Sequence, residues 1–376
     1  MKAQVKGMGN GRLLVALVVL AAILAVPWSA GAQTCTFAHA GNTMKLAGDC
    51  TTSTTITIPN GVTLDGQGHT ITAVDPEGGF FSGGVLANGG AVANVRNVTV
   101  VGALTSTNCG NGGTDRFRGV YIFNGQGNVT NSVFRGIHRG PGNTCEDGNA
   151  IAVENGPFDG TGTHPVQDLI ANNVVEDFQL YGIIVAGNEV ANIVGNQVQT
   201  SWPAPLGGRF CIVAEVGAAG AVTGNTVQGG FVTTGQNVTG VFVLDSSNVL
   251  ISANCVNGTN FGISLQSSCT APALAPAKNN VVIANEINGS NTGVWLGAQS
   301  LPGSTVCNPE LNENLVSLNN IKDTGGLNGI FVGTIANGLS YAPEAVSNAL
   351  TFDGIYGYAT PIQNGGTDTI IEGNRY

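Results

Sequence analysis

The sequence contains few charged and few aromatic residues. Charged residues make up 10% of the 376 residues and aromatic residues 6%, whereas glycine alone contributes 57 residues. Only 13 residues are basic, against 23 acidic ones, which argues against a nucleic acid as the main partner because phosphate binding needs clustered Lys and Arg. The chain is not disordered in composition, since Val, Ile and Leu recur throughout. Abundant Gly, Asn, Thr and Val instead favour many short strands separated by tight turns.

Long apolar runs are also absent, with one exception near the N-terminus. Basic residues precede an apolar run over residues 13–26, and Ala30-Gly31-Ala32 follows it as a small-residue cleavage site. We therefore predict a signal peptide over residues 1–32, a mature domain over residues 33–376, and secretion to the periplasm or the extracellular space. An uncleaved anchor helix is the alternative. No later segment is apolar enough to cross a membrane, so we expect no membrane span after cleavage.

A short pattern of apolar, two residues, Asn, one residue, apolar returns along the mature chain. It is centred on Asn173, Asn196, Asn225, Asn254, Asn285, Asn319 and Asn374. The last gap, of 55 residues, is long enough for two repeats. A second pattern of Gly, apolar, variable, apolar precedes the first at a constant distance, because Gly182 and Asn196 are 14 residues apart, as are Gly240 and Asn254. Constant spacing inside a repeat of variable length indicates fixed strands and one fixed turn.

Short strands that repeat about every 20 to 35 residues are typical of a solenoid, whose coils bury their apolar sides by stacking on their neighbours. Stacked Asn residues at one turn can hydrogen-bond to each other as a ladder. Helical periodicity is absent from the mature chain. The alternative is a β-sandwich or a propeller, but a sandwich would need hairpin signals with two-residue Gly or Asn loops, and few are present.

The segment Ile58–Ile71, IPNGVTLDGQGHTI, looks like the opening coils of right-handed parallel β-helix proteins of the pectin-lyase-like type. The resemblance covers roughly residues 35–376. It implies an all-β fold, a single-stranded right-handed parallel β-helix of about 11 to 13 coils, each adding one strand spacing. The fold hosts lyases, hydrolases, epimerases and adhesins, so it does not assign a function by itself.

All eight cysteines lie in the mature chain, and no two have the C-x-x-C spacing of zinc ribbons and thioredoxin-like redox sites. An even number of cysteines after a secretory signal predicts disulfides. Coil positions favour three pairs, which are Cys35–Cys50, Cys109–Cys145 and Cys269–Cys307. Cys211 and Cys255 occupy different coil positions, so they are a doubtful pair and are alternatively buried thiols.

Alternate residues of each strand should point away from the core, and the second residue after the Gly position should face solvent. On successive coils this position holds Tyr121, Ala152, Ile184, Val213, Phe242, Ser264, Trp295, Phe331 and Tyr356. The high share of aromatic residues predicts a stripe that binds sugar rings or docks another protein. The alternative is that long loops fold over this face and bury it.

Two residues further along, the same outward row holds Glu154 and Glu215, with Asp245 one position beyond it. Two coils apart, the glutamates would be separated by about 9 to 10 Å, near the upper end of the 6.5 to 9.5 Å used by inverting glycosidases. We therefore name Glu154 and Glu215 as candidate catalytic residues. Solvated acids at the ends of strands are the alternative.

Basic residues cluster in one region, where Arg116, Arg118, Arg135 and Arg139 lie close together with His138 among them. Long Gly-rich loops here predict the wall of a groove. In a groove for a uronic-acid polymer, Arg135 or Arg139 would neutralise the carboxylate, and His138 or an arginine would be the base for β-elimination. Arg118 would bind the substrate. The alternative is a set of salt bridges that pin the long loops.

Together these features predict a secreted β-helix protein that binds, and as an enzyme would process, an extracellular polysaccharide or surface glycan, as a polysaccharide lyase or a glycoside hydrolase. The alternative is a non-enzymatic structural or adhesin-like surface protein that binds another protein. We expect no cofactor, with calcium as an option for bridging a polyanion. End-to-end self-association through bare strand edges is a further expectation.

Overall fold

The computed structural model describes residues 34–108, 115–141, 147–156, 167–200, 208–230, 237–268, 277–299, 311–323, 325–333 and 345–376, all of which belong to the unit Thr34–Tyr376. The predicted signal peptide lies outside the described residues. The same holds for Cys109, Cys145, Cys269 and Cys307, so two of the three predicted disulfides remain predictions. No helix among the described residues is long and apolar enough to cross a membrane.

Three long β-sheets build the unit, and the chain visits them in the same order on each coil. Within the described ranges, sheet 1 contains eleven strands: β4 (Ile56–Ile58), β7 (Gly84–Asn88), β10 (Arg118–Phe123), β13 (Asn149–Asn155), β16 (Tyr181–Gly187), β19 (Gly208–Glu215), β22 (Asn237–Leu244), β25 (Phe261–Ser268), β28 (Thr292–Gln299), β32 (Asn328–Val332) and β36 (Thr360–Asn364).

Sheet 2 has thirteen strands in the described part of the chain: β1 (Phe37–Ala40), β2 (Thr43–Leu46), β5 (Val62–Asp65), β8 (Ala93–Arg96), β11 (Asn128–Thr130), β14 (Gln167–Ala171), β17 (Val190–Val194), β20 (Ala219–Thr223), β23 (Val249–Ser252), β26 (Val281–Ile283), β30 (Leu315–Ser317), β34 (Ala349–Thr351) and β37 (Ile370–Glu372).

Sheet 3 has eleven described strands: β3 (Cys50–Thr52), β6 (Thr70–Ala73), β9 (Thr99–Gly102), β12 (Val133–Arg135), β15 (Val174–Glu176), β18 (Gln197–Thr200), β21 (Thr226–Gly229), β24 (Cys255–Asn257), β27 (Glu286–Asn288), β31 (Asn320–Lys322) and β35 (Gly354–Tyr356). A short parallel pair, β29 (Leu311–Asn312) and β33 (Ala345–Val346), lies apart from these sheets.

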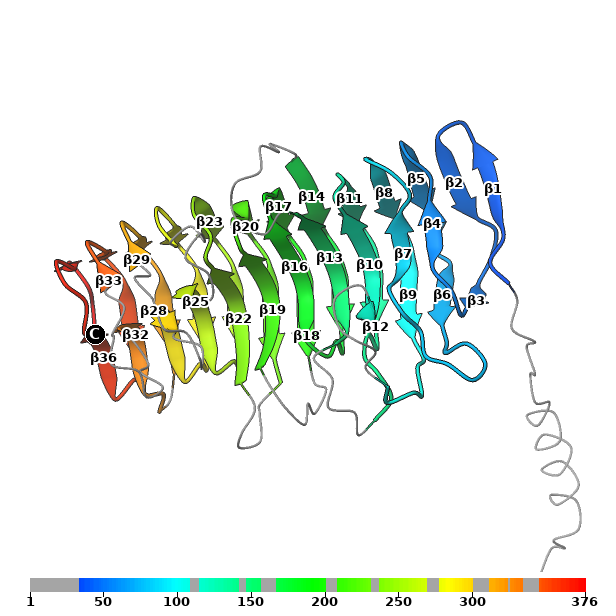
Figure 1. The fold of residues 1–376 in the computed structure, drawn as a ribbon. Helices are drawn as coiled ribbons and strands as arrows, with labels where there is room; N and C mark the ends of the chain where they lie inside the picture. Colours follow the sequence, from blue (N-terminus) through cyan, green and yellow to red (C-terminus); the bar gives the residue numbers. More distant parts are fainter. Residues whose placement is uncertain are drawn as a thin grey trace, which may run out of the picture. The chain divides into compact units, whose positions relative to one another are not determined.

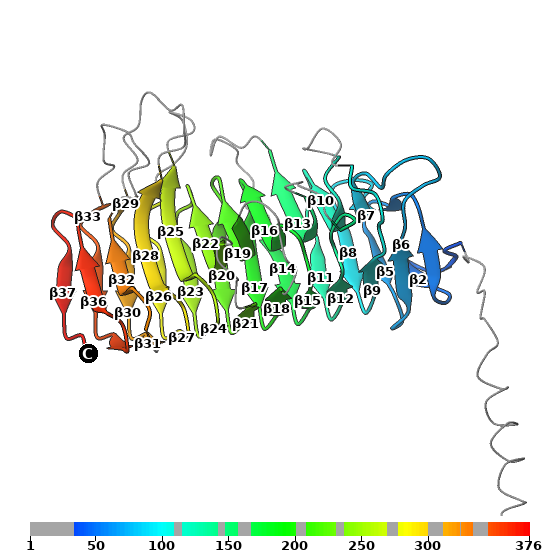
Figure 2. The same cartoon turned by 90° about the horizontal axis from the view of Figure 1, so that it is seen from below.

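The strands stack as the successive coils of a right-handed parallel β-helix, as the sequence predicts (Figures 1 and 2). Sheet 1 and sheet 3 each have eleven strands, which agrees with the lower end of the predicted number of coils. Side chains alternate along each strand, so that Ile183 and Val185 of β16 enter the central core while Ile184 lies in a separate apolar cluster. At Gly182 a Cβ atom would lie 2.6 Å from Val198 Cγ1, which explains the glycine that begins this pattern.

An antiparallel hairpin of β1 and β2 precedes the parallel coils. The predicted disulfide Cys35–Cys50 is present at this end, with an S–S distance of 2.06 Å. Cys211 and Cys255 are both free thiols, and Cys211 is fully buried. Of the two options that the sequence leaves open, the structure has the free thiols, although Cys255 is only partly buried.

The predicted Asn ladder runs along the turn between sheets 2 and 3. At Asn196 both the backbone N–H and the side-chain amide donate to Asn225 Oδ1, at 2.9 and 3.0 Å, and the amide also donates to the carbonyl of Ile170. Asn225 repeats this arrangement with Asn254. The missing rung in the 55-residue gap is Asp353, whose Oδ1 accepts both donors of the preceding Asn.

A second ladder, which the sequence pattern did not reveal, lies at the turn between sheets 1 and 2. There Asn280 N–H donates to Asn314 Oδ1 at 3.0 Å, and Asn314 N–H donates to Asn348 Oδ1 at 3.1 Å. These three residues are 34 residues apart, and each lies five residues before a rung of the first ladder, so the two ladders share one register. Two amide ladders at two corners fix the stacking of the later coils.

Candidate functional site

The outer face of sheet 1 carries the two outward rows that the sequence predicts. Pairing of the strands places Tyr121, Ala152, Ile184, Val213, Phe242, Ser264, Trp295 and Phe331 in one continuous row. Only the last predicted member is wrong, because Tyr356 belongs to β35 of sheet 3 and Gln363 follows Phe331 in the row. The error arises because both Gly354-Ile355-Tyr356 and the strands of sheet 1 begin with Gly and an apolar residue.

Much of this row is buried. From the sequence, burial of this face was the alternative to an open binding stripe. Phe242 and Trp295 are only 6% and 5% exposed, whereas Tyr121 and Phe331 are partly buried. Phe210 packs on Phe242 with ring centroids 4.8 Å apart, and Trp295 packs on Phe331 with centroids 6.4 Å apart. The stripe is therefore chiefly an apolar cluster on the outer face rather than an open platform of rings.

The second row contains the two glutamates. Glu154 of β13 pairs with Ala186 of β16, and Ala186 pairs with Glu215 of β19, so the carboxylates lie two strands apart as the sequence predicts. Leu244 and Gln266 continue the row on the next two strands. The row runs along the carboxyl ends of the strands, where it borders the apolar cluster.

Glu154 is held by two neighbours from β10. Its carboxylate forms an ion pair with Arg118 at 3.3 Å and accepts a hydrogen bond from the Tyr121 hydroxyl at 3.3 Å. The Arg118 guanidinium in turn lies over the Tyr121 ring, 3.9 Å from its centroid. Burial, together with the negative charge of Glu154, raises the pKa of Tyr121 to about 12, so this hydroxyl remains a donor at neutral pH. Arg118 and Tyr121 thus hold the Glu154 carboxylate in one position.

Glu215 differs in its protonation. Burial, together with the negative charges of Glu154 and Asp245, raises the pKa of Glu215 to about 7, against the opposing charge of Arg116. Burial also raises the pKa of Asp245 to about 6, although Asp245 accepts hydrogen bonds from the Ser268 N–H at 2.6 Å and from the Ser268 hydroxyl. The row therefore presents a carboxyl group that exchanges its proton near neutral pH.

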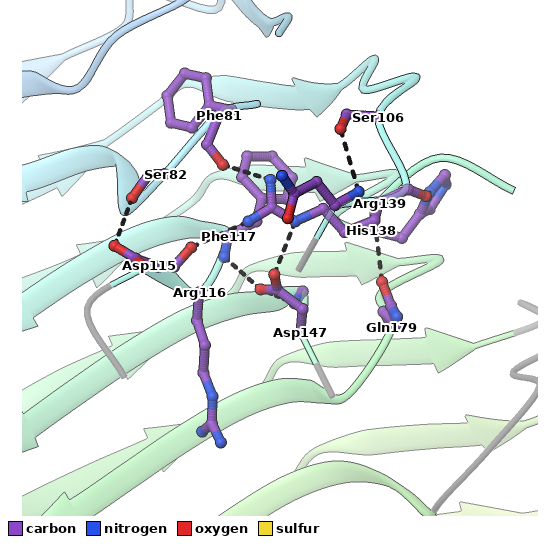
Figure 3. A network of polar contacts seen from close by, with 12 residues as sticks. Phe81, Ser82, Ser106, Asp115, Arg116, Phe117, His138, Arg139, Asp147 and Gln179 are labelled. Atoms are coloured by element: carbon purple, nitrogen blue, oxygen red, sulfur yellow. Dashed lines mark hydrogen bonds and ion pairs between the residues drawn. The ribbon is translucent and has the colours of Figure 1, made fainter. Parts of the chain in front are cut away.

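Arg139, a predicted catalytic residue, lies inside the corner between sheets 3 and 1 (Figure 3). It is fully buried, and its Nε donates to Asp147 at 2.7 Å. Its other nitrogens donate to the carbonyls of Phe81 and Asp115, and Asp147 also accepts the N–H of Phe117. This network has the geometry of the alternative reading, in which ion pairs pin the long loops.

Arg135 and His138 also lie away from the glutamate row. Arg135 is on the outer face of sheet 3, where it forms an exposed ion pair with Glu176 at 2.7 Å. His138 Nδ1 lies 2.8 Å from the Arg139 carbonyl, and burial lowers the pKa of this imidazole. The structure thus brings Arg118 and Tyr121 to the glutamates but places the other three basic candidates elsewhere.

Two residues at the site were not among the named candidates. Arg116 makes no ion pair within the part of the chain that the structure describes, and its side chain points away from the Arg139 network (Figure 3). Its positive charge acts on both Tyr121 and Glu215, since it opposes the rise in the pKa of each. The other residue is Ser268, whose N–H and hydroxyl donate hydrogen bonds to Asp245. In the sequence Arg116 is only a member of the basic cluster and Ser268 does not stand out at all, because only the folded register brings them to the row.

Metal ligands are sparse in the described ranges, where no three His, Cys, Asp or Glu side chains come together. Calcium at this face therefore stays a prediction. The side chains that are present can hold a proton on Glu215, bind the Glu154 carboxylate through Arg118, and place the Arg116 charge near Glu215. This is the chemistry of an acid and a base on one surface.

Solved structures resemble this fold. A single-residue mutant of the periplasmic alginate epimerase AlgG is 10% identical, with a TM-score of 0.56 over 91% of this chain and 80% of that one. The Dettilon tailspike protein is 15% identical with a TM-score of 0.62, and the match spans 88% of this chain but only 59% of that one. An exopolygalacturonase from Thermotoga maritima is 10% identical with a TM-score of 0.51 over 89% and 83% of the two chains.

At such low identity these likenesses establish the fold alone. No protein-family model matches the chain. No curated protein sequence matches it either.

Proposed function

We propose that the outer face of sheet 1 binds an extracellular polysaccharide and that Glu154 and Glu215 hydrolyse its glycosidic bonds. The observation that carries the proposal is a pair of carboxyl groups in one row, two strands apart, with different protonation. Strand spacing separates their backbones by about 9 to 10 Å. Inverting glycosidases use a similar separation to place a water molecule between the base and the sugar.

In this mechanism Glu215 is the general acid. Its raised pKa, about 7, keeps it largely protonated in mildly acidic solution, so it can donate a proton to the leaving oxygen. Glu154 is the general base, because the ion pair with Arg118 and the Tyr121 hydroxyl orient its carboxylate. A water molecule on the far side of the sugar ring would lose its proton to Glu154 as it attacks the anomeric carbon.

The surroundings of the row suit an acidic sugar. The Arg116 guanidinium has no carboxylate partner among the described residues and lies near enough to influence Glu215. Half-buried Tyr121 and Phe210 border the row and half-buried Leu244 belongs to it, and all three offer apolar contact to sugar C–H faces. The names of two structural neighbours, an alginate epimerase and an exopolygalacturonase, also refer to polyuronates.

A hydrolase agrees better with the geometry than a lyase. Elimination would need a cation and a base at the sugar C–H, and the sequence offered Arg135, His138 and Arg139 for these tasks. Arg139 already neutralises a buried carboxylate, and Arg135 lies on another sheet. We infer that Arg139 and His138 support the loops beside the site instead. The Cys35–Cys50 disulfide favours an oxidising compartment and thus the proposed secretion.

The experiment screens purified protein against neutral and acidic polysaccharides for new reducing ends and for the absorbance of unsaturated uronates. We expect reducing ends without unsaturated products, and a loss of about 100-fold or more in rate for both E154Q and E215Q. Glu176→Gln is the matched control, since Glu176 lies on sheet 3, and it should keep full activity.

Two outcomes contradict the hydrolase. Unsaturated products would identify a lyase, and binding of a glycan without any cleavage would identify a binding protein. If no polysaccharide binds at all, the alternative of a structural or adhesin-like protein that binds another protein takes precedence.

A further inference from the structure

Two acidic side chains lie inside the corner between sheets 1 and 2, away from the glutamate row. Asp168, near the start of β14, is 0% exposed, and Glu189, in the turn before β17, is 1% exposed. They come from successive coils, because β14 pairs with β17 and Asp168 lies opposite Ala191. The proposed function uses neither residue.

The hydrogen bonds of this pair are incomplete while both acids are ionised. Asp168 Oδ1 accepts the N–H of Gly127 at 2.5 Å, but Asp168 Oδ2 and both carboxylate oxygens of Glu189 lack a well-formed hydrogen bond. The two carboxyl groups are within hydrogen-bonding reach of each other. The side-chain amide of Asn155 also lies close enough to Glu189 to lower its pKa.

Among the described residues, no positively charged side chain of the surrounding strands balances the pair; residues 157–166, which connect β13 to β14, lie outside the described residues. The strands that form this corner, β11, β13, β14, β16, β17 and β20, contain no Arg, Lys or His. Their only other titratable side chains are Glu154 and Tyr181, and both belong to the outer face of sheet 1. Burial raises the pKa of both acids, that of Glu189 to about 10, against the opposing hydrogen bonds of Gly127 with Asp168 and of Asn155 with Glu189. Two adjacent buried carboxylates cannot both stay ionised under these conditions.

A bound cation would also neutralise the pair, but the ligands are too few. Calcium takes six to eight oxygen ligands, whereas the corner offers three free carboxylate oxygens. No third acid, His or Cys joins them among the residues that the structure describes. A single proton needs no further ligand.

We propose that Asp168 and Glu189 share one proton at neutral pH and so form a carboxyl–carboxylate staple between two successive coils. The proton sits between Asp168 Oδ2 and one Glu189 oxygen, which turns two facing acceptors into a donor and an acceptor. Gly127 satisfies the remaining oxygen of Asp168, and Asn155 lies at the remaining oxygen of Glu189. The staple does not depend on the proposed polysaccharide site, although Asn155 directly follows Glu154 in the chain.

Infrared spectroscopy tests the shared proton directly. At pH 9 the pKa values of Glu215, Asp245 and Asp353, about 7, 6 and 6, leave these groups largely ionised. A C=O stretch of a protonated carboxyl at pH 9 should therefore come from the staple. We expect this band in the wild-type protein and its loss in D168N and in E189Q.

The control for this band is Asp353→Asn, which should leave it unchanged at pH 9. A wild-type protein without the band at pH 9 overturns the proposal. So does a band that persists in both D168N and E189Q, because it would then belong to another group.

Unfolding supplies a second test. Asp168→Asn keeps an oxygen for Gly127 and supplies an N–H in place of the shared proton, so it should fold. An acid whose pKa is raised in the folded state stabilises the folded protein at pH values below the pKa that the acid has in the unfolded chain. This stabilisation is lost as the pH rises towards the pKa of the folded state. The wild-type unfolding constant should therefore rise relative to that of D168N by about tenfold per pH unit between pH 7 and 9.

A calcium titration separates the proton from a cation. We expect the melting temperatures of the wild type and of D168N to be equally insensitive to added calcium and to a chelator. Stabilisation of the wild type alone by calcium, with parallel pH dependence of the two proteins, would overturn the shared proton and assign a cation to the corner.

Discussion

Replacing Asp353 by Asn should stabilise the protein, because Asp353 is the one acid in the Asn ladder. Every asparagine of the ladder uses its amide to donate to a carbonyl of the preceding coil, as Asn319 does to Val282 and Asn374 to Leu350, both at 3.0 Å. Asp353 Oδ2 occupies the corresponding place and has no hydrogen-bond partner. The carbonyl that should face it, by the pairing of β26 with β30, is that of Val316.

The size of the effect follows from the pKa. Burial raises the pKa of Asp353 from 3.8 to about 6, against the hydrogen bonds from Asn319. A shift of about two units is worth about 3 kcal/mol. Because the pKa is raised in the folded state, this stabilisation is complete below pH 4 and is lost as the pH rises through 6. The wild type therefore lacks about 3 kcal/mol at pH 8 that D353N should retain.

The assay is urea unfolding followed by circular dichroism, for the wild type and D353N, at pH 5 and pH 8. We expect a larger free energy of unfolding for D353N at pH 8 and a much smaller difference at pH 5. Asn225→Asp, which puts an acid in the middle of the ladder, is the matched control and should lose stability at pH 8. An equal difference at both pH values, or a less stable D353N at pH 8, would refute the reasoning.

Three other changes probe the long loops, the Cys35–Cys50 disulfide and the glutamate row. Arg139→Met should cost about 3 to 5 kcal/mol in urea unfolding, because it leaves a buried carboxylate without its partner. Replacing Cys35 and Cys50 by Ser should cost about 3 kcal/mol for a 15-residue loop, measured under non-reducing conditions. Glu154→Gln should lower the pKa of Glu215, because it removes a nearby negative charge, and NMR titration of the Glu215 carboxyl would show it. An unchanged pKa of Glu215 in this variant would show that the two glutamates do not interact electrostatically.

The fold and its register could be predicted because they depend on local patterns. Apolar alternation and the regular Asn turn fix which residues share a row, so Glu154 and Glu215 fall two strands apart as expected. The error at Tyr356 shows the limit, since sheet 1 and sheet 3 both accept Gly followed by an apolar residue. Asp353 was missed for a related reason, because its position was recognisable only as a gap between Asn residues.

Burial and partners could not be predicted from spacing. Arg139 lies in a loop between strands, and only the folded chain brings it to Asp147 and to distant carbonyls such as that of Phe81. Likewise Phe242 is buried because Phe210 of the neighbouring strand packs against it, a contact between side chains that no repeat encodes. The candidate site was thus predictable as a row of residues, and its electrostatics were not.

The central claim is that the outer face of sheet 1 binds a polysaccharide, and oligosaccharide titration of methyl-labelled protein tests it most directly. Leu244 belongs to the glutamate row, whereas Val243 and Leu265 of the same sheet point into the core and serve as internal controls. We predict shifts that begin at the Leu244 methyl groups and spare the two controls. Shifts confined to sheet 2 or sheet 3, such as at Leu250 or Val174, would contradict the account.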